Sequence, residues 1–553
     1  MSAIGKKNFD GFLGLAVSAG LLLSVVTLVT VVVVRRLGQV GYMIDDGYIH
    51  LSLARNLLQT GTWGLSPHVF CGASSSPVWT ALLSLTLAAG LVPPAWIPLG
   101  LSLLSALAVL AVSTLVLRAY RIGAAATLVG LVAMVFVTPL TTLVFMGMEH
   151  ALHLCLFIGF AHFAVKVLHE RPSRPRTVWA LAVLATLMAG TRYEGLFAVA
   201  AAALFLLIQR RWALVLLMAA AGFFPMMAFG LYALGQGGPF LPNSLLMKGD
   251  FPQASAAGLF RFIFLEQQHG FQVCTALLET VLLLAVAYFV LPSDDQSAAR
   301  RRTWIVLWLT TVFLHLQFAP IQAGMQRYEA YLVGSGLLIL VLISGPVAAR
   351  LVTGARRALL AHPARHAPTA LLVVMVALSL SEPYVGRAVA LMRFVPSFCE
   401  REYDRNHMSG LFLHEFYRDR TVAVCDLGAT SWYSGSRLVD LWGLGTTDVT
   451  RAYRAGSFNR AWAANYCTEH QVEIAILHSF FVEGRLQGVP AGWTLVGSWR
   501  VQTHEGPQTV CFFAVAPGSA ERLAANLRMW RDRLSPRARL ELGSPWAPAV
   551  ARE

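Results

Sequence analysis

Long apolar runs separated by short basic connections dominate the first 382 residues of the chain. A run of about 20 apolar residues has the length that an α-helix needs to cross a bilayer. The pattern predicts about eleven such spans, at 11–34, 97–117, 123–146, 150–168, 177–191, 195–209, 212–232, 271–292, 303–319, 329–347 and 367–382. We therefore expect residues 1–382 to form a polytopic α-helical membrane module.

The basic residues of the connections predict the orientation of this module. If every second connection lies on the same side of the membrane, that side carries 17 Lys and Arg residues and the opposite side carries 7. Cytoplasmic loops carry the excess of positive charge, so the N-terminus is predicted to be cytoplasmic. The segment 78–92 is apolar enough to cross the membrane. Counting it as a span would move every later connection to the opposite side of the membrane. We therefore expect it to be a juxtamembrane or re-entrant helix within a first outer loop, residues 35–96.

The pattern changes near Glu400, where the long apolar runs stop. A helix is expected at 461–471, and strands are expected at 421–425, 474–477, 493–501 and 509–515. A strand, a helix and a second strand in that order favour a small α/β domain with a parallel pair, within residues 383–553 and outside the cytoplasm. The Arg-rich segment 520–534 is predicted to be an amphipathic helix that could lie on anionic headgroups.

Composition agrees with a membrane protein. The chain is 56% hydrophobic and 13% charged. Its net charge of +14 is explained by the basic connections, so we expect a lipid bilayer and no nucleic acid as partner. Cys155 and Cys274 fall in predicted spans. Up to two disulfides are possible among the five other cysteines, Cys71, Cys399, Cys425, Cys467 and Cys511.

Two adjacent carboxylates, Asp45 and Asp46, stand where the first span ends. They open a stretch from Asp46 to about Gln59 in which an apolar face is broken by polar residues, a mix expected of a helix at the membrane interface. In one interpretation Asp45 caps this helix and Asp46 complements its dipole. In the other, one carboxylate faces a cavity and takes a proton from a sugar hydroxyl as general base.

More polar residues stand at the predicted outer ends of later spans. Carboxylates beside cations would suit a hydroxyl nucleophile together with a lipid-phosphate leaving group, and arginine can hold phosphate in a bidentate fork. The candidates for donor binding are Glu149, His150, Arg192, Glu194, Asn243, Lys248, Arg327 and Tyr328.

These motifs resemble the GT-C superfamily of integral-membrane glycosyltransferases. The first outer loop carries the similarity in Asp45-Asp46-Gly47-Tyr48-Ile49, Ala54-Arg55-Asn56-Leu57, the turn from Gly61 to Gly64, and Ser76-Pro77-Val78-Trp79. Later blocks follow in the same order, namely Gly147-Met148-Glu149, Thr191-Arg192 with Glu194-Gly195, Pro242-Asn243, and Arg327-Tyr328. The resemblance covers most of residues 1–345.

The resemblance implies a polyprenyl-phosphate-linked sugar donor and transfer on the extracytoplasmic side of a bacterial plasma (inner) membrane. The acceptor would be a glycan, lipid or protein hydroxyl, and an acidic residue of the first outer loop would act as base. Bacterial members include terminal arabinofuranosyltransferases, aminoarabinose transferases acting on lipid A, and protein mannosyltransferases. The Asp-Asp-x-Tyr form and the outer C-terminal domain are most similar to the first group.

Acceptor contacts and metal dependence stay open at this level. Tyr48 and His68 in the first outer loop, with Trp432 and Tyr433 after the first strand, are candidate acceptor contacts, although the last two could equally pack the domain. The motifs identify no certain cofactor, and a divalent metal bound by acidic and histidine side chains is possible. Direct displacement with inversion is favoured, because retention needs a second carboxylate about 5 Å from the base.

Two other classes of protein would also explain several spans. A multi-pass transporter predicts an internal repeat with broken helices in matching places, and no such repeat is visible in the sequence. A non-catalytic component of envelope polysaccharide export would not need charges gathered at the outer membrane face. A glycosyltransferase is therefore the expected function.

Overall fold

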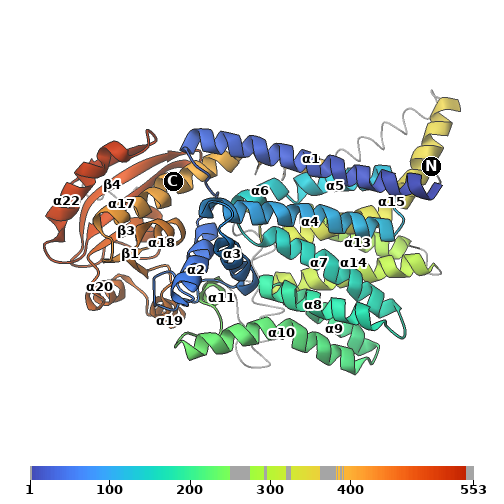
Figure 1. Ribbon diagram of the computed structural model, residues 1–553, viewed down its shortest axis with the longest axis horizontal. Helices are drawn as coiled ribbons and strands as arrows, with labels where there is room; N and C mark the ends of the chain where they lie inside the picture. Colours follow the sequence, from blue (N-terminus) through green and yellow to red (C-terminus); the bar gives the residue numbers. More distant parts are fainter. Residues whose placement is uncertain are drawn as a thin grey trace.

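The computed structural model describes residues 3–248, 275–291, 295–318, 325–361 and 381–543, apart from 383, 387–388 and 390–391. Figure 1 shows an elongated bundle of helices with a sheet-containing domain packed against one end. The predicted division of the chain into apolar helices and a small C-terminal sheet region is thus confirmed.

The bundle helices follow the predicted spans closely. They are α1 Ala3–Leu37, α4 Ile97–Ala119, α5 Ala124–Val137, α6 Leu140–Met146, α7 His150–His169, α8 Pro175–Thr191, α9 Gly195–Ile208, α10 Trp212–Gly235, α13 Thr275–Val290, α14 Gln296–Phe318 and α15 Ala330–Ala361. The span predicted at 123–146 is bent by 40° between α5 and α6. Pro139 stands at this break, where it cannot continue the backbone ladder of a helix. Residues 271–274, 292, 319 and 367–380 of three predicted spans lie outside the described residues.

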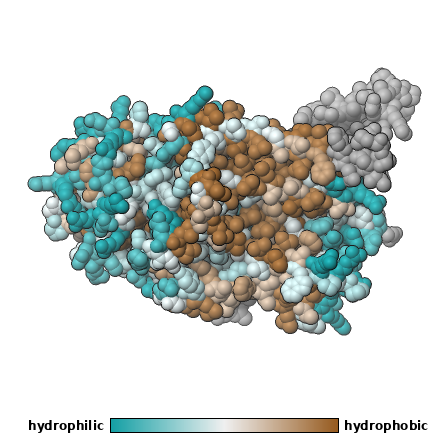
Figure 2. Space-filling model, in the orientation of Figure 1, coloured by the Kyte–Doolittle hydropathy of each residue, from teal (hydrophilic) through white to brown (hydrophobic). Residues whose placement is uncertain are grey.

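The surface of the bundle has the character of a membrane protein. Figure 2 shows a hydrophobic belt over the bundle, a hydrophilic C-terminal domain at one end and further hydrophilic surface at the other. Within the described ranges four helices are long and apolar enough to cross a bilayer, or five if the bent pair α5 and α6 is one span. The number eleven therefore stays a prediction.

The first outer loop forms two helices, α2 Asp46–Thr60 and α3 Pro77–Ala89, followed by the short turn η1 Pro94–Trp96. The predicted helix at 46–59 is confirmed, and its position at the membrane interface stays a prediction. Nine residues of α2 are buried, because α3 covers one side and the C-terminal domain covers another. α2 is therefore an internal connector between the two parts of the molecule (Figure 1).

The C-terminal domain is a six-stranded sheet with the order β2-β1-β3-β5-β4-β6. The strands are β1 Thr421–Val424, β2 Arg437–Asp440, β3 Ile474–His478, β4 Thr494–Thr503, β5 Gly506–Ala514 and β6 Ala538–Leu542. β1 pairs in parallel with β2 and β3, and the remaining pairs are antiparallel. The predicted strand, helix and parallel strand are confirmed. β2 and β6 were not predicted, since charged residues interrupt their apolar positions.

Helices cover both faces of this sheet. One face packs against η2 Tyr403–His407, α17 Met408–Phe416 and α22 Ser519–Trp530, and the other against α19 Thr447–Arg454, α20 Arg460–Glu469 and α21 Ser479–Gly484. Alternation along β1 explains this, because Val422 and Val424 enter one core while Ala423 and Cys425 enter the other. A further helix, α18 Gly428–Ser434, follows β1 and faces α2.

Two sequence predictions for this region are wrong. The amphipathic helix at 520–534 exists as α22, but its apolar residues Leu523, Leu527 and Trp530 are buried against the sheet and cannot lie on headgroups. The six described cysteines are free and buried, so no disulfide forms among them. Cys425, Cys467 and Cys511 pack in one core of the C-terminal domain as unbonded thiols.

Candidate active site

A cavity of about 250 Å³ lies where the bundle, the first outer loop and the C-terminal domain meet. Its polar wall comes from the start of α2 and from three turns of the bundle, those between α6 and α7, α8 and α9, and α14 and α15. These elements bring together the predicted residues Asp46, Glu149, Arg192, Glu194, Arg327 and Tyr328. Leu444 of the C-terminal domain and Ser244 of α11 Asn243–Lys248 close the cavity on the other side.

Arg192 is the most strongly paired cation of the cavity. Its Nη1 donates to Glu149 Oε1 at 2.6 Å, and its Nη2 donates to Glu194. His150 Nε2 lies 3.4 Å from the same Nη1. Only 8% of the Arg192 side chain is exposed, so burial strengthens these charge-assisted bonds and fixes the guanidinium in place.

Arg327 has one acidic partner in the cavity. Its Nη2 donates to Asp46 Oδ2 at 2.8 Å, and 23% of the Asp46 side chain is exposed. Tyr328 lies next to both arginines, with its ring centroid 5.0 Å from the guanidinium carbon of Arg327 and 5.3 Å from that of Arg192. The ring separates two like charges and interacts favourably with each.

His50 of α2 connects the acidic side of the cavity to the first outer loop. Its Nε2 lies 3.7 Å from Glu149 Oε2, and its Nδ1 lies 3.1 Å from Ser74 Oγ and 3.3 Å from Thr80 Oγ1. These contacts were missed by the sequence reasoning. The Ser-rich segment before Pro77 was the available signal, because a buried hydroxyl needs a polar partner.

Asp45 has a different environment from Asp46. Its carboxylate accepts backbone N–H groups of Gly428 and, at 2.8 Å, of Ala429, which begin α18. Asp45 occupies the N-cap position of α2, as one of the two interpretations expected, but its side chain makes no capping hydrogen bond to this helix. Burial, together with the nearby charges of Asp426 and Glu402, raises the pKa of the Asp45 carboxyl well above its usual range. Asp45 therefore holds the first outer loop against the C-terminal domain.

Several predicted residues do not line the cavity. The side-chain amide of Asn243 donates to Leu444 O at 3.2 Å, which ties α11 to the C-terminal domain, and the Lys248 side chain lies outside the described part of the chain. Tyr48 and Tyr433 pack against each other with ring centroids 5.9 Å apart.

The other two candidate acceptor contacts also lie elsewhere. The guanidinium carbon of Arg55 in α2 lies 4.4 Å from the centroid of the Trp432 ring. Trp432 of α18 therefore packs against α2. His68 is exposed in a loop. Within the described ranges no group of three or more histidine, cysteine, aspartate or glutamate side chains could hold a metal ion.

The comparisons with known proteins agree with this architecture. A family model described as "Domain of unknown function (DUF8728)" matches residues 399–513. No curated protein sequence is significantly similar to the chain. The structure of ArnT from Cupriavidus metallidurans bound to undecaprenyl phosphate is similar with a TM-score of 0.50 and 13% identity, covering 91% of this chain and 99% of that one.

Two other solved structures are similar over a comparable share of this chain. The archaeal oligosaccharyltransferase AglB from Archaeoglobus fulgidus, in complex with an inhibitory peptide and a dolichol-phosphate, has a TM-score of 0.49 and 10% identity, covering 90% of this chain and 74% of that one. The arabinofuranosyltransferase AftD from Mycobacteria has a TM-score of 0.45 and 15% identity, covering 91% of this chain and 40% of that one.

The architecture and the match to ArnT define the class, a membrane protein with the fold of the GT-C glycosyltransferases. The predicted resemblance is thereby confirmed at the level of the fold. Within that class the chain is similar to ArnT over nearly the full length of both proteins.

Proposed function

We propose that this protein transfers a sugar from a polyprenyl-phosphate donor to a hydroxyl of an envelope glycan, lipid or protein. The observation that carries the proposal is the convergence of Asp46, Arg192 and Arg327 from three separate elements on one cavity at the end of an apolar bundle. Such a cavity offers cations for a phosphate and a carboxylate for a hydroxyl proton. The match to ArnT, solved with undecaprenyl phosphate, supports the donor class.

Arg327 is the proposed anchor of the donor phosphate. Arg192 is neutralised by Glu149 and Glu194, whereas Arg327 pairs with Asp46 in this cavity. An arriving phosphate would replace Asp46 on the guanidinium, since both are oxyanions that accept from the same N–H groups. Asp46 would then lose its stabilising cation, and its affinity for a proton would rise.

Asp46 is the proposed general base. The exchange at Arg327 removes a cationic partner from its carboxylate when the donor is in place, which couples donor binding to deprotonation of the acceptor. Asp45 is less suited, because both of its oxygens accept backbone N–H groups of α18. A base must have a lone pair directed at the proton that it takes.

Inversion is the proposed stereochemical outcome. The acceptor oxygen forms a bond to the anomeric carbon while the bond from that carbon to the phosphate oxygen breaks. The proton moves to Asp46, and the charge departs on the lipid phosphate. Retention would need a second carboxylate nucleophile at the anomeric carbon. Glu149 is a poor nucleophile, because it is buried and paired with Arg192.

The proposed site faces the extracytoplasmic side of a bacterial plasma membrane. The basic connections between α7 and α8 and between α9 and α10 belong to the opposite end of their helices from Glu149 and Arg192. A cytoplasmic location of those connections follows the positive-inside rule and directs the cavity and the C-terminal domain outward.

Reconstituted protein tests the function. Proteoliposomes loaded with an undecaprenyl-phosphate-linked radiolabelled sugar and supplied with envelope glycan fragments should form labelled product with wild-type protein. The Asp46→Asn variant should form none, although it inserts and binds the carrier. Labelled sugar that crosses the bilayer without new glycosidic bonds would instead identify a transporter. The absence of both transfer and transport would refute both functions.

A further inference from the structure

A second cleft, of about 210 Å³, lies between α2 and the sheet of the C-terminal domain. It is located at the carboxyl ends of the parallel strands, where Asp426 follows β1, Asp440 ends β2 and Phe480 follows β3. Ligands of α/β sheets bind outside the carboxyl ends of parallel strands, where the connections diverge. The proposed catalytic mechanism makes no use of these three residues.

Two aromatic rings and several carboxylates form the walls. Trp442 and Phe480 lie nearly edge to face, with centroids 6.4 Å apart, and 49% of Phe480 is exposed. The lining includes Asp45, Asp46, Asp426 and Asp440, and no lysine or arginine of the described chain is part of it. This acidic lining disfavours an anionic ligand.

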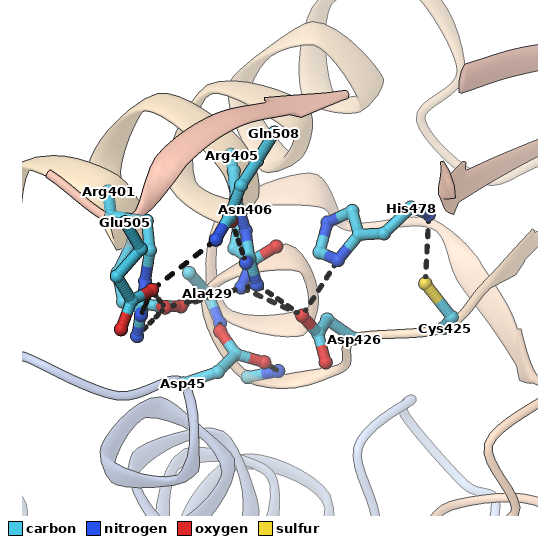
Figure 3. A network of polar contacts seen from close by, with 12 residues as sticks. Asp45, Arg401, Arg405, Asn406, Cys425, Asp426, Ala429, His478, Glu505 and Gln508 are labelled. Carbon is cyan, nitrogen blue, oxygen red and sulfur yellow. Dashed lines mark hydrogen bonds and ion pairs between the residues drawn. The ribbon is translucent and has the colours of Figure 1, made fainter. Parts of the chain in front are cut away.

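The polar partners of Asp426 fix its orientation. Its Oδ2 accepts from Arg405 at 3.0 Å and from Asn406 at 3.2 Å, and His478 Nδ1 lies 3.3 Å away. Figure 3 shows the second oxygen of Asp426 directed away from these groups, on the side that faces Asp45. One oxygen is thus held by the protein while the other is presented to the cleft.

Asp440 positions the aromatic wall. Its two oxygens accept the backbone N–H groups of Trp442 and Gly445, each at 2.8 Å. These bonds define the turn after β2 and hold the indole of Trp442 beside Phe480. The cleft thus has two ring faces beside the second oxygen of Asp426, an arrangement that recognises a sugar, since a hydroxyl donates to a carboxyl oxygen and the C–H face of the sugar ring packs on aromatic carbon.

We infer that this cleft binds a neutral saccharide unit of the acceptor, one position away from the reacting hydroxyl. Asp46, Ile49 and Leu444 line both the cleft and the catalytic cavity, so a chain of sugars lying in the cleft would reach the base directly. The role of the cleft in acceptor binding rests on the proposed glycosyl transfer, whereas saccharide binding by the cleft does not depend on it. The inference makes the acceptor a glycan of at least two units.

Saccharide binding can be measured without any transfer reaction. Saturation-transfer NMR on the full-length protein in nanodiscs, with mannobiose, arabinobiose, cellobiose and maltose as neutral probes, should detect at least one disaccharide. Phe480→Ala should weaken this binding about three- to tenfold, the loss expected for one ring contact. The matched control is Met529→Ala, because Met529 is 61% exposed on α22, which packs on other strands.

Each outcome has a defined meaning. Binding that is weakened in Phe480→Ala and unchanged in Met529→Ala supports the assignment. Binding of none of the four disaccharides, or equal binding by both variants, overturns it. Binding of calcium from calcium chloride, or of phosphate from sodium phosphate, in preference to the disaccharides also overturns it. The cleft would then be a cation site or an anion site. Sugar transfer by wild-type protein, assayed separately, distinguishes a failure of this inference from a failure of the proposed function.

Discussion

Asp46 and Arg327 are 281 residues apart in the chain, and their side chains meet with Oδ2 and Nη2 separated by 2.8 Å. This contact connects the first outer loop to the turn before α15. The proposed base thus forms an ion pair with the cation that is proposed to bind the donor phosphate. Donor binding and proton transfer would therefore depend on the same pair of residues.

The two neighbouring aspartates should behave differently on substitution. Asp46→Asn should lower the rate of sugar transfer about a hundredfold or more, because a neutral amide cannot accept the hydroxyl proton. Its affinity for undecaprenyl phosphate should be unchanged or higher, since the phosphate no longer competes with a carboxylate at Arg327. Transfer kinetics and carrier binding in nanodiscs measure both effects. Full activity of Asp46→Asn would contradict the assignment of the base.

Arg327 should control affinity for the lipid carrier. Arg327→Ala should weaken binding of undecaprenyl phosphate about thirtyfold or more, because a buried charge-assisted contact is lost. Arg327→Lys should restore part of it, as a point charge without the bidentate fork. Arg176→Ala is the matched control, because Arg176 is exposed near the start of α8. Equal carrier binding by the Arg327→Ala and Arg176→Ala variants would exclude Arg327 as the anchor.

Gly428 should be intolerant of a side chain. A Cβ atom there would overlap the carbonyl oxygen of Asp45, whereas a Cβ at Gly484 would meet nothing within 4 Å. Gly428→Ala should therefore separate α18 from α2 and lower the thermal midpoint by about 2–4 °C or more, from an overpacking cost of about 1–3 kcal/mol. Gly484→Ala should leave the midpoint close to that of wild type. A Gly428→Ala midpoint as high as that of Gly484→Ala would show that this contact is not tight.

Asp440 should make the stability of the chain depend on pH. Burial raises the pKa of Asp440 to about 7, although backbone N–H groups of Gly445 and Trp442 act in the opposite direction. The folded state then keeps a proton that the unfolded state, with an aspartate pKa of about 3.9, has lost. This contribution is complete below about pH 4 and declines by up to about 1.4 kcal/mol per pH unit until about pH 7.

Thermal midpoints between pH 4.5 and 7.5 test this dependence. The difference between wild type and Asp440→Asn should shift steadily against wild type as the pH rises, because the amide does not titrate. Parallel curves would show that the Asp440 proton is bound equally in both states.

The helices could be predicted from sequence, but many of their contacts could not. Apolar runs determine a span locally, so the predicted boundaries lie within a few residues of α4 and α7. The sequence could also group Asp46, Glu149 and Arg192. Each stands at the end of a predicted span, and the alternating direction of successive spans places these ends on the same side of the membrane. The partner of Asp45 is 383 residues further along the chain, a separation that no periodic pattern records.

The same reason explains the errors in the C-terminal region. The apolar face of α22 is visible in sequence, but whether a membrane or a sheet covers it depends on tertiary packing. Asn243 was predicted to bind the donor, yet its amide donates to the Leu444 carbonyl of the C-terminal domain, a contact that the sequence does not indicate. The cleft between α2 and the sheet is formed by residues from two distant parts of the chain, so no single motif indicates it.

Leu444 closes the catalytic cavity, and residues 428 and 429 hold Asp45. Synthesis reaches these positions only after the described bundle helices are complete. A ribosome-bound intermediate with all of those helices inserted would still lack one wall of its reaction chamber. In the proposed function, sugar transfer would therefore begin only after the last domain has folded.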